Sequence, residues 1–346
     1  MPENKKTPDP RRGTEPPVSR LAVYFVTFLI ILAITAWIAA RSAPVDGQTI
    51  EAAPVTAAPA RIGPEHVSTA TAPVHPSPEI SWEPSTPLQG HVFLLRVHDT
   101  AGGTITGVEG RAGERLHFEA AGDGAFESLV PVPIDHEGAL EVALTVRYPG
   151  GDVVALPRAV PVGPGAYEHE RLTVAPRFGT PMSEADQARL ARDQERARAV
   201  SEAAHDTPRL WGPAMVIPRV DRVTSGFGNG REFNGRVTSR HMGLDLDGET
   251  GDTVYAAARG VVELVDEFLL AGNLVYLNHG AGLVTGYFHL SEQLVAPGDT
   301  VEAGAPIGRV GATGRVTGPH LHWVVRYGHT SVDPRSLLSV MGVPFP

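Results

Sequence analysis

Val316-Thr-Gly-Pro-His-Leu-His-Trp-Val-Val-Arg-Tyr327 is the stretch that most narrows the fold and the chemistry of this chain. The β-branched and aromatic residues after the proline are typical of a strand. Side chains two apart on a strand point to one face, so we expect His320 and His322 to face the same cavity. Leu321 and Trp323 then point the other way, into the core.

Two further segments supply side chains that bind metals, His241-Met-Gly-Leu-Asp245 and Gly-Tyr-Phe-His289-Leu. The leucine–aspartate alternation at the end of the first segment favours an extended chain, in which residues four apart share a face. A catalytic zinc takes three protein ligands and keeps one position for water. His241, Asp245 and His322 can supply those ligands. His289 and His320 then stand beside the ion as unligated imidazoles. One such histidine alone could be an ordinary surface or core residue, but the five residues together favour a metal site.

Composition excludes several classes of protein. The chain has 346 residues, enough for two domains, and no cysteine, so disulfides and thiolate zinc sites are excluded. Its net charge of −10 argues against non-specific binding to nucleic acid. We therefore expect no nucleic-acid partner.

Residues 21–40, LAVYFVTFLIILAITAWIAA, contain no charged side chain and are long enough to cross a bilayer as a helix. Lysines and arginines precede them, and a positive flank stays cytoplasmic. This pattern predicts a cytoplasmic tail at 1–20 and a single-pass anchor at 21–40 in the inner membrane. A cleaved signal peptide is the alternative, because small residues follow the apolar run, but that run is longer than a usual signal sequence.

Composition also divides the remaining chain. Residues 41–87 are rich in Ala and Pro and are predicted to be a disordered linker. Residues 88–175 alternate polar and apolar side chains in short runs, which predicts a small β-sandwich. The histidines of this segment have no ligand spacing and are interpreted as surface residues: His91, His98, His117 and His136.

The last two segments differ in secondary structure. Residues 181–206 predict a connecting helix, capped by Ser183 and mostly solvated, that acts as a strut between domains. Residues 207–346 hold apolar β runs separated by glycine turns, which predicts antiparallel strands. The fold class expected from the sequence is therefore mainly β.

Five ordered motifs of the C-terminal segment resemble the M23 (lysostaphin/LytM-like) zinc peptidases. They are Ser225-Gly-Phe-Gly, Arg240-His-Met-Gly-Leu-Asp-Leu, Asn278-His-Gly-Ala-Gly-Leu, Tyr287-Phe-His-Leu-Ser and Gly308-Arg-Val-Gly-Ala-Thr-Gly-Arg-Val-Thr-Gly-Pro-His-Leu-His-Trp. The sandwich before them resembles the immunoglobulin-like N-terminal domain of some of these enzymes. The resemblance implies a barrel-sandwich-like β-fold (a duplicated hybrid motif) over 207–346, with zinc in an open groove.

The resemblance also implies roles for the five polar residues. His241, Asp245 and His322 match the zinc ligands of the family, and His289 and His320 match its catalytic histidines. The implied activity is that of a zinc metalloendopeptidase, which hydrolyses the peptide cross-links of cell-wall peptidoglycan through a zinc-activated water. With the predicted anchor, the catalytic domain would face the stem peptides in the periplasm. D-Ala–meso-diaminopimelate bridges are the preferred substrate and glycine bridges the second.

Other functions stay open. Some relatives with this fold lack the metal residues and activate cell-wall amidases as non-catalytic LytM-type regulators, although retention of all five residues argues against this role. The sandwich could instead make the chain a wall-binding module. A further hypothesis is autoinhibition, in which Asn234 or a linker residue occupies the open zinc position. The regulatory protein partner, the oligomeric state and the identity of the base are not fixed.

Overall fold

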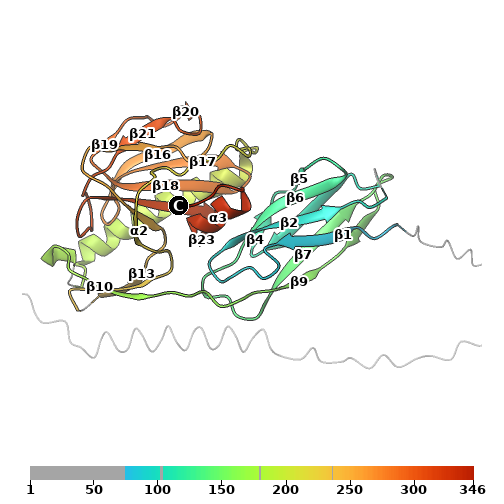
Figure 1. The fold of residues 1–346 in the computed structure, drawn as a ribbon, viewed down its shortest axis with the longest axis horizontal. Coiled ribbons are helices and arrows are strands. Elements are labelled where there is room, and N and C mark those ends of the chain that lie inside the picture. The colour runs from blue at the N-terminus through green and yellow to red at the C-terminus, as the bar shows by residue number, and fades with distance from the viewer. Residues whose placement is uncertain (1–74, 102–103, 179–180, 236) are drawn as a thin grey trace, which may run out of the picture. The chain divides into compact units, whose positions relative to one another are not determined.

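The computed structural model describes residues 75–101, 104–178, 181–235 and 237–346. The predicted cytoplasmic tail, the anchor and residues 41–74 of the predicted linker lie outside these ranges. Within the ranges, no helix combines the length and the apolar character needed to cross a bilayer. Strands predominate there, with two α-helices, so the prediction of a mainly β fold is confirmed (Figure 1).

The N-terminal part of the described chain is a sandwich of two antiparallel sheets (Figure 1). One sheet has the order β1 (Glu79–Glu83), β2 (Val92–His98), β6 (Ala125–Pro131), β5 (Glu119–Ala120). The other has the order β4 (Glu114–Leu116), β3 (Gly107–Ala112), β7 (Ala139–Arg147), β8 (Val153–Ala155), with β9 (Arg158–Pro161) also beside β7. The alternation of apolar and polar residues explains why these strands pack as a sandwich. On β7, alternate apolar residues are buried between more exposed neighbours, among them Leu140, Val142 and Leu144.

Strand β1 corrects the predicted linker, which extended to residue 87. It pairs antiparallel with β2, with Trp82 opposite Leu95. Ile80 and Trp82 alternate with exposed residues, which is a strand pattern. The Ala- and Pro-rich composition of residues 41–87 indicated disorder instead. Composition could not reveal that β2 supplies the hydrogen bonds that this backbone needs.

The C-terminal part is built on an eight-stranded antiparallel sheet. Its order is β11 (Val223–Ser225), β14 (Leu244–Asp247), β22 (His320–Tyr327), β18 (Leu283–Leu290), β17 (Gly272–Gly280), β16 (Gly260–Phe268), β20 (Thr300–Val301), and β23 (Thr330–Val332) lies beside β22. A smaller sheet has the order β15 (Thr253–Tyr255), β21 (Pro306–Arg309), β19 (Glu292–Gln293). Leu321 and Trp323 are fully buried in the core of this domain, as the alternation on β22 predicted. A short helix, α3 (Pro334–Val340), follows the last strand.

A third sheet corrects the predicted end of the sandwich at residue 175. Strand β10 (His169–Leu172) pairs in parallel with β12 (Gly230–Phe233), which pairs in turn with β13 (Val237–Arg240). The segment that leaves the sandwich therefore becomes an edge strand of the C-terminal domain. A 3₁₀ turn, η1 (Pro176–Phe178), follows it. Because β10 is short and its partner lies sixty residues further on, local pattern gave no sign of this pairing.

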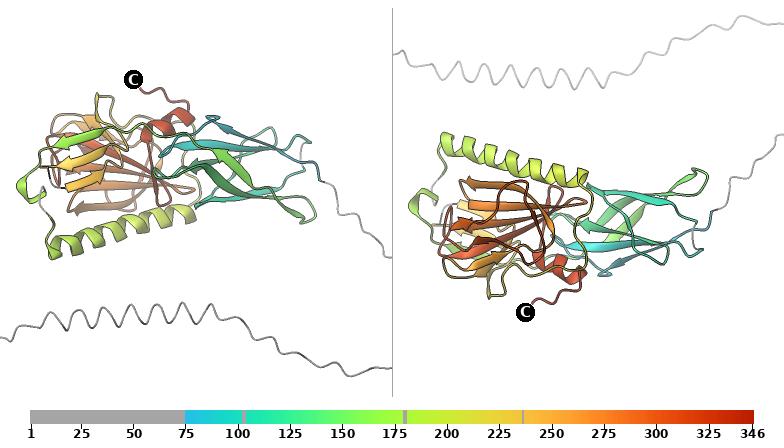
Figure 2. Two further views of the ribbon diagram at one scale, coloured as in Figure 1. Left: turned by 90° about the horizontal axis from the view of Figure 1, so that it is seen from below. Right: turned by 90° about the horizontal axis from the view of Figure 1, so that it is seen from above.

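Helix α2 (Glu184–Asp206) lies along one face of the large sheet (Figure 2). The hydroxyl of Ser183 accepts a hydrogen bond from the Asp186 amide at 3.1 Å and so caps the helix. Ala197 and Val200 pack with the sheet residue Tyr276. Most of the helix is exposed or half-buried, which confirms the prediction of a mostly solvated helix, but the sequence did not predict this buried face. Small side chains give a weak apolar signal, but they let a helix approach a sheet closely.

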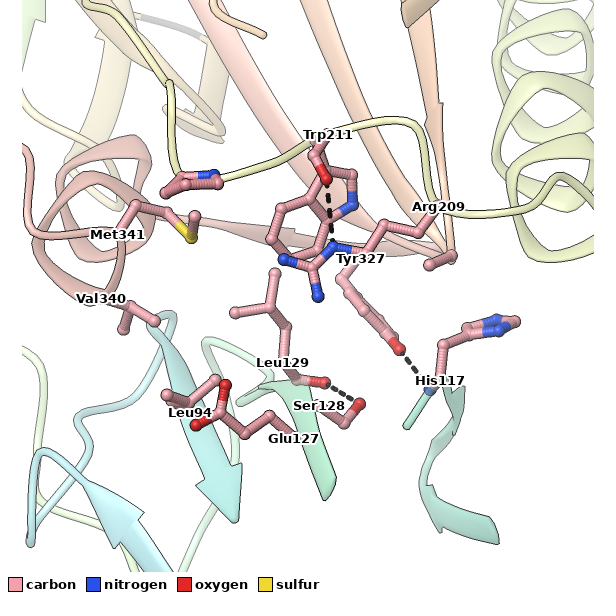
Figure 3. A pocket seen from close by; sticks show the side chains of 12 residues that line it. Leu94, His117, Glu127, Ser128, Leu129, Arg209, Trp211, Tyr327, Val340 and Met341 are labelled. Atoms are coloured by element: carbon pink, nitrogen blue, oxygen red, sulfur yellow. Dashed lines mark hydrogen bonds between the residues drawn. The ribbon is translucent and has the colours of Figure 1, made fainter. Parts of the chain in front are cut away.

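His117 is not the surface residue that the sequence predicted. At the junction of the sandwich and the C-terminal domain, its Nε2 lies 2.9 Å from Nδ1 of His205, and the two rings stack. Burial, and then the charge of His205, lowers the pKa of His117 to about 4. A cavity of about 240 Å³ adjoins this pair, with Trp211 and Tyr327 among its walls (Figure 3). None of the five predicted site residues lines this cavity.

Candidate metal centre

Three of the predicted site residues converge on one point of the large sheet. Asp245 on β14 and His322 on β22 are direct cross-strand partners. The Nε2 of His241 lies 2.9 Å from Oδ1 of Asp245 and 2.8 Å from Nδ1 of His322. That oxygen and that nitrogen are 2.7 Å apart. These are the only three His, Cys, Asp or Glu side chains in the described residues that group closely enough to hold a metal ion.

His241 reaches this point from a loop, and the sequence interpretation of one shared strand was wrong. Strand β13 ends at Arg240 and β14 begins at Leu244, so His241 lies in the connection between them. Gly243 makes this connection possible. A Cβ at that position would lie 2.7 Å from the ring of His322 and 2.7 Å from the carbonyl oxygen of Trp323. A side chain there would push the loop away from the sheet.

Hydrogen bonds orient the first two candidate ligands. The carbonyl oxygen of Gly226 lies 2.7 Å from Nδ1 of His241, and because a carbonyl can only accept, Nδ1 carries the proton. The lone pair of Nε2 is then directed at the cluster. The two carboxylate oxygens of Asp245 have different contacts. Oδ1 faces the two imidazoles, and Oδ2 accepts a hydrogen bond from Arg231 at 2.5 Å. One oxygen is thus available as a ligand, and the other holds the carboxylate in place.

Burial and charge decide the protonation of this cluster. Burial alone would raise the pKa of Asp245, but the charge and hydrogen bonds of His241 and His322 hold it well below its usual range. Burial lowers the pKa of His322 to about 4, against the opposing effect of Asp245. The donor set at neutral pH therefore includes a carboxylate and a neutral imidazole at His322. Imidazole nitrogens and a carboxylate oxygen, three in number, fit the requirements of a catalytic zinc.

His289 and His320 lie beside the cluster without joining it. Their ring centroids are 4.9 Å apart, and Nε2 of His320 is 3.6 Å from Oδ1 of Asp245. Each ring donates from Nδ1 to a backbone carbonyl, His289 to Thr313 at 2.8 Å and His320 to Gly318 at 2.9 Å. Both Nε2 atoms are consequently proton acceptors.

The backbone of His289 is strained in a way that fits a functional role. Its φ of 64° lies in the left-handed region, which residues with a side chain rarely adopt. The residue is the last but one of strand β18, and its amide donates to the carbonyl of Ala271 at 2.9 Å. Burial, and then the charges of His320 and His322, holds the pKa of His289 well below its usual range, so the ring is neutral at neutral pH.

Three residues around the cluster were not predicted as site residues. Arg231 on β12 donates to Asp245, to Ser225 at 2.7 Å and to Glu170 at 3.2 Å. Ser225 in turn donates to Glu170 at 2.7 Å. Ser225 opens one of the motifs quoted above, so a signal for it existed. Glu170 comes from β10, and no local pattern could connect it to a strand sixty residues away.

Two cavities flank the cluster. The larger, of about 430 Å³, is lined by Asp245 and His320, and the smaller, of about 180 Å³, by His241, His289 and His322. Both also have Arg231 and Arg315 in their walls. An extended chain lying across the shared wall would pass the candidate ligands and both free imidazoles.

Asn234 does not occupy the site, so this form of the autoinhibition hypothesis was wrong. Its side chain accepts from the amide of Val174 and donates to the carbonyl of Val174, both at 3.0 Å. Asn234 lies in the turn between β12 and β13 with a positive φ of 50°. Its nearness in sequence to the metal motif does not bring it close, because the hairpin carries it to the β10 side.

A carboxylate and two imidazoles, with two further imidazoles beside them on an antiparallel sheet, fit a catalytic zinc site. Residues 239–334 match the model of peptidase family M23. This part of the chain is therefore a domain of peptidase family M23, which confirms the resemblance seen in the sequence.

Curated relatives agree with this assignment. The chain is 38% identical over 118 residues to the peptidoglycan DD-endopeptidase ShyC of Vibrio cholerae, a match that covers 34% of this chain and 27% of the relative. It is 46% identical over 105 residues to ShyA of the same organism, which covers 30% of this chain and 24% of the relative. The chain thus spans about a quarter of the length of these curated relatives.

The fold likeness extends over more of the chain. A crystal structure of a candidate M23 peptidase from Pseudomonas aeruginosa superimposes with a TM-score of 0.57 and 24% identity. The match covers 74% of this chain and 96% of that one. At this identity the likeness concerns the fold alone.

Proposed function

We propose that this chain is a membrane-anchored zinc metalloendopeptidase that hydrolyses the peptide cross-links of peptidoglycan. The observation that carries the proposal is the convergence of His241, Asp245 and His322 within 2.9 Å of one another inside an M23 domain. The relatives named as peptidoglycan DD-endopeptidases support the choice of substrate. Because they share only part of their length with this chain, the substrate is inferred from the common domain.

The residues of the cluster fit zinc. His241 would bind through Nε2, His322 through Nδ1 and Asp245 through Oδ1, and three protein ligands leave one position for water. Bound zinc supplies a Lewis acid and lowers the pKa of a coordinated water to about 7. Arg231 keeps Oδ2 of Asp245 away from the cluster, so that this carboxylate offers a single oxygen.

His289 and His320 would transfer the protons of the hydrolysis reaction. With Nδ1–H fixed on a backbone carbonyl, the Nε2 of either ring can accept a proton from the attacking water. The protonated ring then has a donor in the same place, which can serve the developing oxyanion or the leaving amine. Their low exposure removes competing water. The two rings are arranged alike, so either can be the first acceptor.

The location is also part of the proposal. A helix at 21–40 in the inner membrane, with residues 1–20 in the cytoplasm, would leave the M23 domain in the periplasm next to its substrate. A cell-wall amidase regulator of the same fold is the main alternative. The complete set of ligands and free imidazoles favours the enzyme, because a regulator has no need of either.

Digestion of purified sacculi tests the proposal. The full chain in detergent should release cross-linked muropeptides as monomers, as seen by mass spectrometry, and a chelator should stop this until zinc is restored. His320→Ala should lose most of its activity and retain its metal. Unchanged muropeptides in the presence of stoichiometric zinc would rule out the hydrolase. The full chain is needed because β10, outside the 207–346 segment, supplies Glu170 to the site.

A further inference from the structure

Arg315 is a half-buried cation beside the candidate metal centre. It lies in the loop before β22, where its backbone amide donates to Leu270 at 2.8 Å. Its guanidinium lies 4.0 Å from the centre of the Phe233 ring. In the described part of the chain, the guanidinium has no acidic partner and no side-chain hydrogen bond. Burial, and then the charge of Arg231, lowers its pKa to about 10, which still leaves it positively charged at neutral pH.

This arrangement is costly unless a ligand supplies the missing charge. A cation taken out of water needs an opposite charge or several hydrogen bonds to offset its lost hydration. The Phe233 ring offsets only part of that loss. Arg231 shows the contrast, because it pairs with both Glu170 and Asp245. Among the residues that the structure describes, no carboxylate pairs in this way with Arg315.

Arg315 is also close to the reaction centre. It lines both the larger cavity, with Asp245 and His320, and the smaller cavity, with His241 and His289. Its five N–H groups are arranged to bind a carboxylate through two parallel hydrogen bonds. A carboxylate held there would share these cavities with a peptide bond at the cluster.

We infer that Arg315 binds a free carboxylate of the substrate next to the scissile amide, and so selects the cross-link. The inference rests on the proposed function. In a D-Ala–meso-diaminopimelate bridge, the carbon that bears the scissile amide nitrogen also bears a carboxylate. A glycine bridge has no charged group at that place. Arg315 therefore favours the diaminopimelate type and disfavours its amidated form and glycine bridges.

Paired substrates test the inference. Two cross-linked peptides are needed that differ only in this group, one with the free carboxylate and one with the carboxamide. The wild-type chain should cleave the carboxylate form with a kcat/KM about 10- to 100-fold higher, as expected for a charge-assisted hydrogen bond. Arg315→Gln should cleave both forms at similar rates, near that of the wild type on the carboxamide. Arg315→Lys should keep part of the preference.

Arg259→Gln is the matched control, since Arg259 pairs with Glu302 and lines neither cavity. It should keep the full preference. A preference that survives in Arg315→Gln, or wild-type rates equal for the two peptides, would overturn the inference and leave the proposed hydrolase intact.

Calorimetric binding of the same peptides separates the two proposals. If the chain cleaves neither peptide but binds the carboxylate form more tightly, and Arg315→Gln abolishes the difference, the proposed function fails and the role of Arg315 stands. Equal affinity for both, or no affinity for either, counts against Arg315 as the selecting residue.

Discussion

Asp245 and His322 lie directly opposite each other on β14 and β22, with Oδ1 of one 2.7 Å from Nδ1 of the other. Two of the three candidate ligands are thus fixed by the register of a central strand pair. A slip of β14 by one residue would turn Asp245 to the other face of the sheet, away from His322. The precision of the site therefore depends on the core packing that holds this register.

Asp245→Asn should abolish metal binding, because the amide has no charge and is a weaker ligand. Removing a residue that hydrogen-bonds to a metal ligand lowers metal affinity about 10- to 100-fold, and the loss of a ligand itself should lower zinc affinity further. Elemental analysis after dialysis measures it. Asp247→Asn, two residues along the same strand, is the control, since Asp247 pairs with Arg222 at the surface. Equal metal content in both variants would disprove the role of Asp245.

Arg231→Gln should weaken metal binding without unfolding the protein. The change removes the donor to Oδ2 of Asp245, and the carboxylate can then rotate. We expect about a 10- to 100-fold lower zinc affinity, measured by competition with a chelator. Arg222→Gln removes an exposed arginine of the same domain and should have no effect. An unchanged affinity in Arg231→Gln would show that the sheet alone orients the carboxylate.

His289→Ala and His320→Ala should separate metal binding from catalysis. Each variant should keep a stoichiometric metal and lose about 10²- to 10⁴-fold in kcat, the usual contribution of a general acid or base. His169→Ala, an exposed histidine on β10, is the control for loss of an imidazole. Loss of the metal together with the activity would make the residue concerned a ligand.

Gly243→Ala should destabilise the folded protein by about 1–3 kcal/mol, the usual cost of an added methyl in a tightly packed place. The new Cβ would meet the ring of His322 at 2.7 Å. Denaturant unfolding measures the change, and zinc binding should weaken as well. Gly212→Ala is the control, because a Cβ at Gly212 has nothing within 4 Å. Similar unfolding free energies in the two variants would refute the close approach.

The buried His279 should lower the free energy of unfolding at acidic pH. Its ring is fully buried, with Nδ1 on the carbonyl of Arg259 at 2.8 Å, and burial lowers its pKa from 6.5 to about 4. Between these values the unfolded chain binds a proton that the folded chain does not, so the free energy of unfolding decreases as the pH falls through this window. The full difference is about 3 kcal/mol, present above pH 6.5 and lost by pH 4. Unfolding of wild type and His279→Gln across this range checks it, and parallel curves would exclude His279 as a source.

The strands could be predicted where the alternation was strong and local. Strands β7 and β22 followed their patterns, because a side-chain period of two reports directly which face is buried. Strands β1 and β10 were missed. Each is short, and each exists because a partner elsewhere in the chain completes its hydrogen bonds. Helix α2 was predicted, but its buried face was not, since alanine carries little of the apolar signal.

The sequence by itself determined which side chains carry the chemistry, because imidazoles and a carboxylate in these motifs have few uses other than holding a metal ion and moving protons. It also determined the alternation that turns His320 and His322 to one side. Only the tertiary structure decided how His241 reaches the cluster, why Gly243 must be small, and that Arg231 and Glu170 support Asp245. It alone shows that no carboxylate in the described ranges pairs with the half-buried guanidinium of Arg315. These features depend on contacts between residues far apart in the chain, whose formation follows from burial and register across the whole sheet rather than from any local pattern.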